Sequence, residues 1–316
     1  MRFRTPRRFV LAIALTALAS VSARAGQVRI NVASISFNNS SVTLNRGDHA
    51  VWVWTSSGHT VTSGDGNTST PDGHFNSGDI PINSGSTFSW KSNFTGPQPY
   101  YCIPHAPPMS ADLAMVASGA SVSDFRITKV QFGNPGGLDF IEIANIGPAP
   151  GDLGMYRLRI SGAATITLKK SANTTLAVPS GGRVVIYINQ SGTTNDANIF
   201  VPTVAALPTT GSLALYVPNT VNTSLVAVDQ IIDYVSWGAG GQENEPTAVS
   251  AGFWSANAAI QNVAPGHAIA FCGAQGGQYG ANNWSEITVP NFGTAAADCT
   301  TPALRTSWGR IKSLYR

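Results

Sequence analysis

The stretch "LNRGDHAVWVWT" (residues 44–55) carries the clearest strand signal in the chain. A tight turn, "RGD", leads into a run that alternates valine with tryptophan. Successive side chains of a strand point to opposite faces, so Val51 and Val53 share one face. Trp52 and Trp54 share the other. We expect one face of this strand to belong to a hydrophobic core.

The same signal recurs along most of the chain. Short runs rich in Val, Ile, Phe and Trp are separated by Gly, Ser, Thr, Asn and Pro, and only 11% of the residues are charged. Beyond the first 25 residues no long segment has the 3.6-residue period of a helix. The pattern predicts an all-β, helix-free protein. Its length favours two domains, which we place at residues 26–120 and 121–300.

Residues 1–25 read "MRFRTPRRFVLAIALTALASVSARA". Arginines, a short apolar run and a final A-x-A pattern are typical of a secretory signal peptide, cleaved here before Gly26. We therefore expect export to the periplasm, the cell surface or the extracellular space. Whether the route is the general secretory one or the twin-arginine one is left open.

The balance of charge depends on where the basic residues lie. The whole chain has 19 Lys and Arg against 16 Asp and Glu, but five of the arginines belong to residues 1–25. Four more basic residues lie in the tail 301–316, for which a disordered end and an interfacial or sorting segment are both considered. The remainder is acidic, so we expect no nucleic-acid partner.

A second stretch, "YYCIPHAPPM" (residues 100–109), gathers unusual side chains on one loop. Cys102, His105 and Met109 lie there, and His59 ends a strand about forty residues earlier. Two imidazoles, a thiolate and a weak axial thioether are the ligands of copper electron-transfer sites. The proline at position 104 favours the tight turn that this spacing needs. The alternatives are a structural or disulfide-bonded Cys102 and a different axial ligand, Met115, which the alternation assigns to the core instead.

These residues resemble the cupredoxins, the blue copper family of plastocyanin and pseudoazurin. The matching segments are "RGDHAVWVW", "GHTVTS", "FNSG", "GSTFSW", "YYCIPH" and the following methionine. The resemblance implies a Greek-key sandwich and one type 1 copper held by His59, Cys102, His105 and Met109. It also implies electron exchange with redox partner proteins at an apolar rim around His105. Thr60 stands where many members have asparagine, and its hydroxyl can still tie the two ligand loops together.

The second half contains another set of strand-like runs. "DFIEIANIG", "GDLGMYRLR", "VPSGGRVVIY", "DYVSWG" and "NNWSEITVPNFG" resemble the lamin-tail domain. That resemblance implies an immunoglobulin-like sandwich used for attachment or interaction, for instance at a cell surface. Two carboxylate pairs, Asp139 with Glu142 and Asp229 with Asp233, are candidates for acid-base chemistry, but we expect structural roles for them.

The remaining cysteines and histidines receive simple interpretations. With Cys102 assigned to copper, Cys272 and Cys299 are expected to form a disulfide. His49, His74 and His267 have no cysteine or acidic cluster at ligand spacing, so we expect ordinary surface or turn positions for them.

The sequence thus predicts an exported carrier of single electrons rather than an enzyme. A surface structural or adhesion protein that uses the copper domain as a scaffold, and a periplasmic copper delivery or storage protein, are the alternatives. An oxidase needs further clusters of histidine, and the chain has only five histidines. The oligomeric state is left open.

Overall fold

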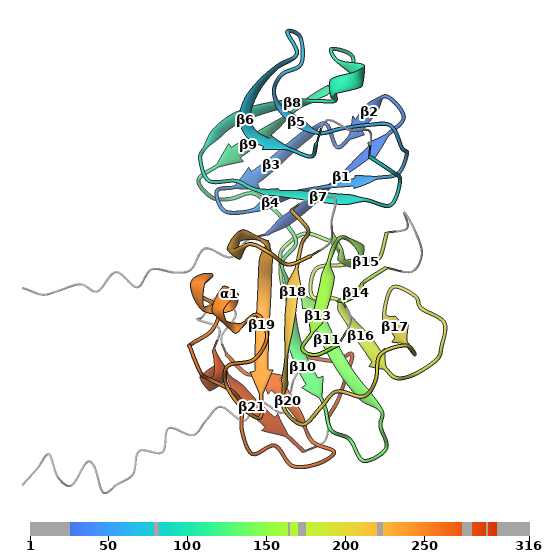
Figure 1. Cartoon of the computed structure of the whole chain (residues 1–316), viewed down its shortest axis with the longest axis vertical. Helices are drawn as coiled ribbons and strands as arrows, with labels where there is room; N and C mark the ends of the chain where they lie inside the picture. The colour runs from blue at the N-terminus through green and yellow to red at the C-terminus, as the bar shows by residue number, and fades with distance from the viewer. Residues whose placement is uncertain are drawn as a thin grey trace, which may run out of the picture.

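The structure is a computed structural model that describes residues 26–78, 82–163, 165–169, 175–219, 224–273, 280–288 and 290–295. The described residues are almost entirely strands and turns, so the all-β prediction is confirmed. The predicted signal peptide and the basic tail lie outside these residues. The described strands form two sandwiches, one above the other in Figure 1.

In the described residues, the first sandwich has nine strands. They are β1 (Gln27–Ala33), β2 (Ser36–Asn38), β3 (Ser41–Asn45), β4 (His49–Trp54), β5 (Thr62–Asp65), β6 (Thr70–Asn76), β7 (Thr87–Lys91), β8 (Gly96–Tyr101) and β9 (Ser110–Val116). One sheet has the order β2-β1-β4-β7 and the other the order β3-β9-β8-β5-β6. A 3₁₀ turn, η1 (Ile103–His105), follows β8.

Apolar side chains of both sheets fill the space between them. Ile30, Trp52 and Phe88 come from one sheet, and Tyr100 and Leu113 from the other. All are buried, and the rings of Trp52 and Tyr100 meet edge to face at 5.4 Å. Burial of side chains this large contributes most of the stability of a domain of this size.

The second sandwich begins after Ser123. Its elements are β10 (Phe125–Gln131), β11 (Asp139–Asn145), β12 (Gly151–Asp152), η2 (Leu153–Met155), β13 (Arg157–Ile160), β14 (Thr165–Thr167), β15 (Ala177–Val178), β16 (Arg183–Ile188), β17 (Asn198–Val201), β18 (Gly211–Tyr216), η3 (Val228–Gln230), β19 (Ile231–Trp237), α1 (Glu245–Ser250), β20 (Ala268–Phe271), η4 (Ala281–Asn283) and β21 (Trp284–Ile287). Its two main sheets have the orders β17-β16-β11-β10-β20-β21 and β14-β13-β18-β19, and β12 pairs with β15.

The helix-free expectation is wrong at one place, where α1 forms a short helix. Pro246 lies in its first turn, where a missing N–H costs no intrahelical hydrogen bond. Ala248 is fully buried and belongs to the core of the second sandwich. The helix is therefore held by packing, because six residues are too few for stability by helical propensity alone.

Strand β4 is buried on both faces, whereas the sequence pattern predicted one core face. Trp52 and Trp54 pack in the core of the first sandwich. Val51 and Val53 belong to the hydrophobic core of the second sandwich, although they come from the first. At β4, the outer face of the β2-β1-β4-β7 sheet is thus covered by the other half of the chain.

Polar contacts extend this interface. His49 Nε2 lies 2.6 Å from the main-chain oxygen of Asp229, and the Ser89 hydroxyl donates to the main-chain oxygen of Pro218. His49 is 1% exposed, so the expectation of a surface or turn position is wrong for it. Burial lowers the pKa of His49 to about 3, so the ring is neutral at pH 7 and its Nε2 donates this hydrogen bond.

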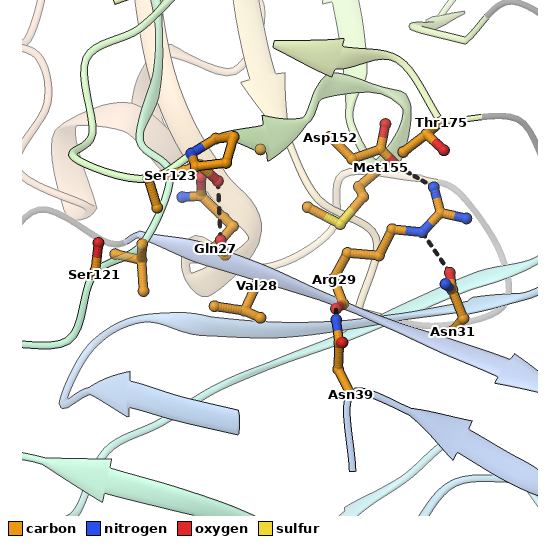
Figure 2. Close-up of a pocket in the computed structure, with 14 residues that line it drawn as sticks. Gln27, Val28, Arg29, Asn31, Asn39, Ser121, Ser123, Asp152, Met155 and Thr175 are labelled. Atoms are coloured by element: carbon orange, nitrogen blue, oxygen red, sulfur yellow. Dashed lines mark hydrogen bonds and ion pairs between the residues drawn. The ribbon is translucent and has the colours of Figure 1, made fainter. Parts of the chain in front are cut away.

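A cavity of about 370 Å³ lies along the seam between the two sandwiches. Arg29 on β1 reaches across it to the carboxylate of Asp152, and its Nε donates to Asn31 Oδ1 at 2.6 Å (Figure 2). On the same seam the Tyr156 hydroxyl donates to the side-chain oxygen of Gln27. These charged and polar contacts, together with the apolar contact at β4, hold the two sandwiches in a fixed orientation.

Three of the four carboxylates of the two acidic pairs have structural partners; the fourth, Asp229, is exposed, and its main-chain oxygen contacts His49. Glu142 is fully buried and forms ion pairs with Lys129 at 3.1 Å and Arg183 at 2.7 Å. Asp139 accepts a hydrogen bond from the main-chain N of Leu207, and Asp233 accepts one from that of Ile127. These acids hold neighbouring segments together, as expected.

The remaining predictions concern cysteines and surface histidines. Cys272 is disulfide-bonded, and the predicted partner Cys299 lies outside the described residues. His74 and His267 lie at the surface, where they contact Gln98 and Glu286 respectively. In the described part of the chain, no helix has the length and apolar character needed to cross a membrane.

Candidate metal centre

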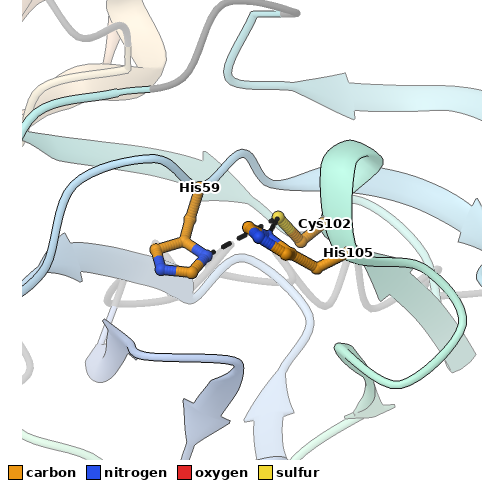
Figure 3. Close-up of side chains that lie close together, drawn as sticks. All are labelled: His59, Cys102 and His105. Carbon is orange, nitrogen blue, oxygen red and sulfur yellow. Dashed lines mark hydrogen bonds between the residues drawn. The ribbon is translucent and has the colours of Figure 1, made fainter.

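Three of the four predicted ligands meet at one end of the first sandwich. His59 follows β4, Cys102 follows β8, and His105 ends the turn η1 (Figure 3). Their potential ligand atoms all lie within 4.8 Å of one another. No other group of three His, Cys, Asp or Glu side chains in the described ranges meets in this way.

Both imidazoles present the same ring nitrogen to the sulfur. Cys102 Sγ lies 3.3 Å from His105 Nδ1 and 3.9 Å from His59 Nδ1. The two rings are 4.8 Å apart between their centroids. Nitrogen and sulfur ligands bind a metal ion at about 2.0–2.3 Å, which places neighbouring ligand atoms roughly 3–4 Å apart. The two sulfur–nitrogen separations fit one shared metal ion.

The loop between β8 and β9 is closed by its own main chain. The N–H of Cys102 donates to the oxygen of Met109, and the N–H of Met109 donates to the oxygen of His105, both at 3.0 Å. The N–H of His105 donates to the oxygen of Cys102 at 3.1 Å. Three predicted ligands of the short loop are thus connected before any metal ion arrives.

Thr60 connects this loop to the loop that carries His59. Its hydroxyl oxygen accepts a hydrogen bond from the main-chain N of Ile103 at 2.8 Å, which confirms the predicted tie between the two loops. Its own main-chain N–H donates to Cys102 Sγ at 3.3 Å. The second contact was not anticipated, because a main-chain donor leaves no trace in the identity of the residue.

The backbone of His59 is held by two further donors. The indole N–H of Trp54 donates to the His59 main-chain oxygen at 2.9 Å, and the N–H of Ile82 donates to the same oxygen at 3.1 Å. Trp54 is fully buried. The sequence pattern assigned Trp54 to the core, where it lies, but gave no sign of its second role in positioning His59.

Met109 is 1% exposed and belongs to the same core cluster as Cys102. Met115, the alternative axial ligand, lies in β9 and is buried in this cluster as well. Its position on the strand matches the core role expected for it.

Burial controls the protonation of the site. It lowers the pKa of His59, and neighbouring His105 lowers it further, so the neutral ring that a metal requires is favoured. Burial also raises the pKa of the Cys102 thiol, and the hydrogen bonds from Thr60 oppose that effect. Cys102 is a free, fully buried cysteine, so its sulfur is not consumed in a disulfide.

The site is buried on one side and open on the other. His59 and Cys102 are buried, while His105 is half-buried and is the most exposed of the three. Around it lies an apolar rim, of which Ile103, Pro104, Pro107 and Pro108 are exposed. Figure 1 shows the turn after β8 at the end of the first sandwich away from the second.

The Thr60→Val variant tests the connection between the two loops. It keeps the shape of the side chain but removes the oxygen that accepts from Ile103, so we expect about 10-fold weaker copper binding in a titration against a competing chelator. Thr62→Val is the matched control, since the Thr62 hydroxyl contacts Asn76 and not the ligand loops. Equal copper affinities of the two variants would contradict the role given to Thr60.

No family model and no curated protein matches this chain. Among solved structures, it is similar to an amicyanin from Paracoccus versutus, with 18% identity over 28% of this chain and 81% of the amicyanin and a TM-score of 0.24. It is also similar to a purple cupredoxin from Nitrosopumilus maritimus, with 21% identity over 29% of this chain and 99% of that one and a TM-score of 0.25. A pseudoazurin from Sinorhizobium has 19% identity over 28% of this chain and 73% of its own, with a TM-score of 0.23. These similar structures are cupredoxins, and each is matched by less than a third of this chain.

Proposed function

We propose that this protein is an exported type 1 copper protein that carries single electrons between redox partners. The observation that supports it is the convergence of one free thiol and one ring nitrogen from each of two histidines within 4.8 Å at the end of a β-sandwich. Held by these three residues and by Met109, copper would supply a centre that alternates between Cu(II) and Cu(I).

The chain's own contribution is a site that changes little between the two states. The closed loop from Cys102 to Met109, the Thr60 bridge and the Trp54 contact all restrict the ligands in advance. A preorganised site needs little rearrangement when the charge of the metal changes, and this favours electron transfer over metal release. The half-buried His105, with the apolar rim around it, is the natural place for a redox partner to dock briefly.

The second sandwich, in this proposal, is the lamin-tail-like module that attaches the carrier to a surface or a larger assembly. It contacts the first sandwich through β4, on the outer face of the β2-β1-β4-β7 sheet. Because that sheet is occupied, the end with His105 is left for redox partners. Export is proposed from the A-x-A pattern before Gly26.

Copper titration of the chain that begins at Gly26 tests this function. We expect one copper per chain, an intense visible thiolate-to-Cu(II) band, and reversible one-electron voltammetry with copper retained through repeated cycles. In Met109→Leu the band should survive while the potential shifts, since a weak axial ligand tunes the site rather than building it. Met115→Leu is the matched control and should leave the potential unchanged.

The other functions correspond to other outcomes of the same experiment. Loss of copper to a modest chelator on each reduction would favour delivery or storage. A chain that stays folded and colourless with copper would favour a structural or adhesion protein with a cupredoxin-like scaffold, and the proposed site would then be wrong.

A further inference from the structure

Gly26, the first residue that the structure describes, is buried beside Asp48, with little space around its Cα. Its main-chain N donates to Asp48 Oδ1 at 2.7 Å, and its oxygen accepts from the N–H of His49 at 2.8 Å. A β-carbon added at Gly26 would lie 2.0 Å from Val122 Cγ2, so a residue with a side chain does not fit without movement. Gly26 is thus packed between Asp48 of the first sandwich and Val122 of the segment that leads into the second.

Asp48 is 1% exposed, and neutral groups supply its hydrogen bonds. Besides Gly26, the main-chain N and the side-chain Nδ2 of Asn45 donate to its Oδ2, at 2.7 and 2.8 Å. No Lys or Arg among the described residues forms an ion pair with it. Lys91 interacts with its charge only at longer range, and Asp124, which is itself paired with Arg126 at 2.8 Å, is a second acidic group nearby.

A buried carboxylate of this kind is costly, because burial removes the water that stabilises its charge. Burial accordingly raises the pKa of Asp48, and Asp124 raises it further, while the hydrogen bonds from Asn45 and Gly26 oppose the effect. Buried charges in proteins are nearly always paired with an opposite charge. The atom best placed to carry that opposite charge is the nitrogen of Gly26, which already contacts Oδ1.

We propose that the α-ammonium group of the mature chain pairs with Asp48, so that removal of the signal peptide completes a buried ion pair. Hydrolysis of the Ala25–Gly26 bond by a signal-removing peptidase consumes one water, leaves the new carboxylate on the departing leader and leaves an ammonium group on Gly26. The existing hydrogen bond to Asp48 Oδ1 then joins two opposite charges. The inference rests on cleavage before Gly26 and does not depend on the copper site.

The pair acts on the turn that starts the doubly buried strand. Asp48 closes the turn between β3 and β4 through Asn45, and Gly26 precedes β1, which runs beside β4 in parallel. Cleavage at this bond is therefore expected to tighten both strands. A chain that begins at Ala25 keeps an amide nitrogen at Gly26, and its α-ammonium group lies on Ala25 instead.

Four versions of the mature chain test the pair through a double-mutant cycle. Two begin at Gly26 and two at Ala25, and one of each carries Asp48→Asn. Asp48→Asn also alters the hydrogen bonds with Asn45, but it does so in the chains that begin at Gly26 and at Ala25 alike. That effect on stability therefore cancels in the cycle. We expect Asp48→Asn to lower Tm by at least about 6 °C more in the chain that begins at Gly26, since it leaves a buried ammonium group unpaired. An equal loss of Tm in both backgrounds would overturn the proposal.

Two further measurements keep Asp48 unchanged, so they test the proposal even if the Asp48→Asn variant does not fold. Acetylation of the Gly26 amine removes its charge alone and should lower Tm, whereas an unchanged Tm would contradict the pair. In the unmodified chain, an N-hydroxysuccinimide ester should label the Gly26 amine about 10-fold more slowly than the amine of the chain that begins at Ala25, as read by peptide mass spectrometry. Equal labelling rates would show that the Gly26 amine is not held by Asp48.

Discussion

The variant Cys102→Ser is expected to lose the visible thiolate-to-Cu(II) band completely while both sandwiches stay folded. The band requires the sulfur, and a serine hydroxyl does not replace a thiolate as a copper ligand at neutral pH. Cys102 is fully buried, so the new hydroxyl should lower the free energy of unfolding by about 1–3 kcal/mol, which is less than the stability of a typical domain. Absorption spectroscopy after copper addition, together with thermal unfolding, separates the two effects.

Met115→Leu is the matched control for this experiment. Met115 is also a buried sulfur-containing residue of the same core cluster, but it lies within β9 and away from the ligand loops. Its replacement should leave the colour intact with a similar small change in stability. A band that survives in Cys102→Ser would refute the assignment of the sulfur ligand, and so would a band that disappears in both variants.

The second large effect is expected when the first sandwich is produced alone as residues 26–120. The fragment contains all four predicted copper ligands, so it should bind copper and show the same band. Val51 and Val53 lose their cover, which corresponds to about 3 kcal/mol of lost apolar burial. We therefore expect its Tm to lie more than about 10 °C below that of the first sandwich in the full chain, and we expect it to self-associate.

The double variant Val51→Thr, Val53→Thr distinguishes lost cover from general damage. In the fragment, these residues face water, so the threonines should restore a monomer without changing the band. In the full chain, the same substitutions bury two hydroxyl groups in the core of the second sandwich and should destabilise it by about 3 kcal/mol. Calorimetry and size-exclusion chromatography measure both. A wild-type fragment that is monomeric and as stable as the same sandwich in the full chain would contradict the shared core.

Much of the fold was predictable because hydrophobic alternation reports burial directly. β4, β9 and β16 were visible as alternating or continuous apolar runs. β5 and β6 were not, since β6 exposes almost all of its side chains and the sequence "TPDGHFN" resembles a loop. The helix α1 was missed because six residues give too short a window for a helical period.

The candidate metal site also has features that the sequence predicts and features that it does not. The proximity of His59, Cys102 and His105 was predictable from residue type and spacing, and so was the tie through the Thr60 hydroxyl. Contacts made through the main chain, such as the donation from Thr60 N to the sulfur, carry no signal in the sequence. His49 was misjudged for a related reason: only the packing of the second sandwich places its ring against Asp229.

Strand β4 sets a limit on how this protein can be altered. Every one of its six residues is buried, and alternate side chains serve different cores. A deletion or insertion of one residue in the "RGD" turn that shifted the strand would exchange the tryptophans with the valines and misplace both sets at once. Neither sandwich can therefore be redesigned or transplanted with its neighbour ignored, and graft boundaries placed only at residues 119–122 would divide a unit that β4 keeps whole.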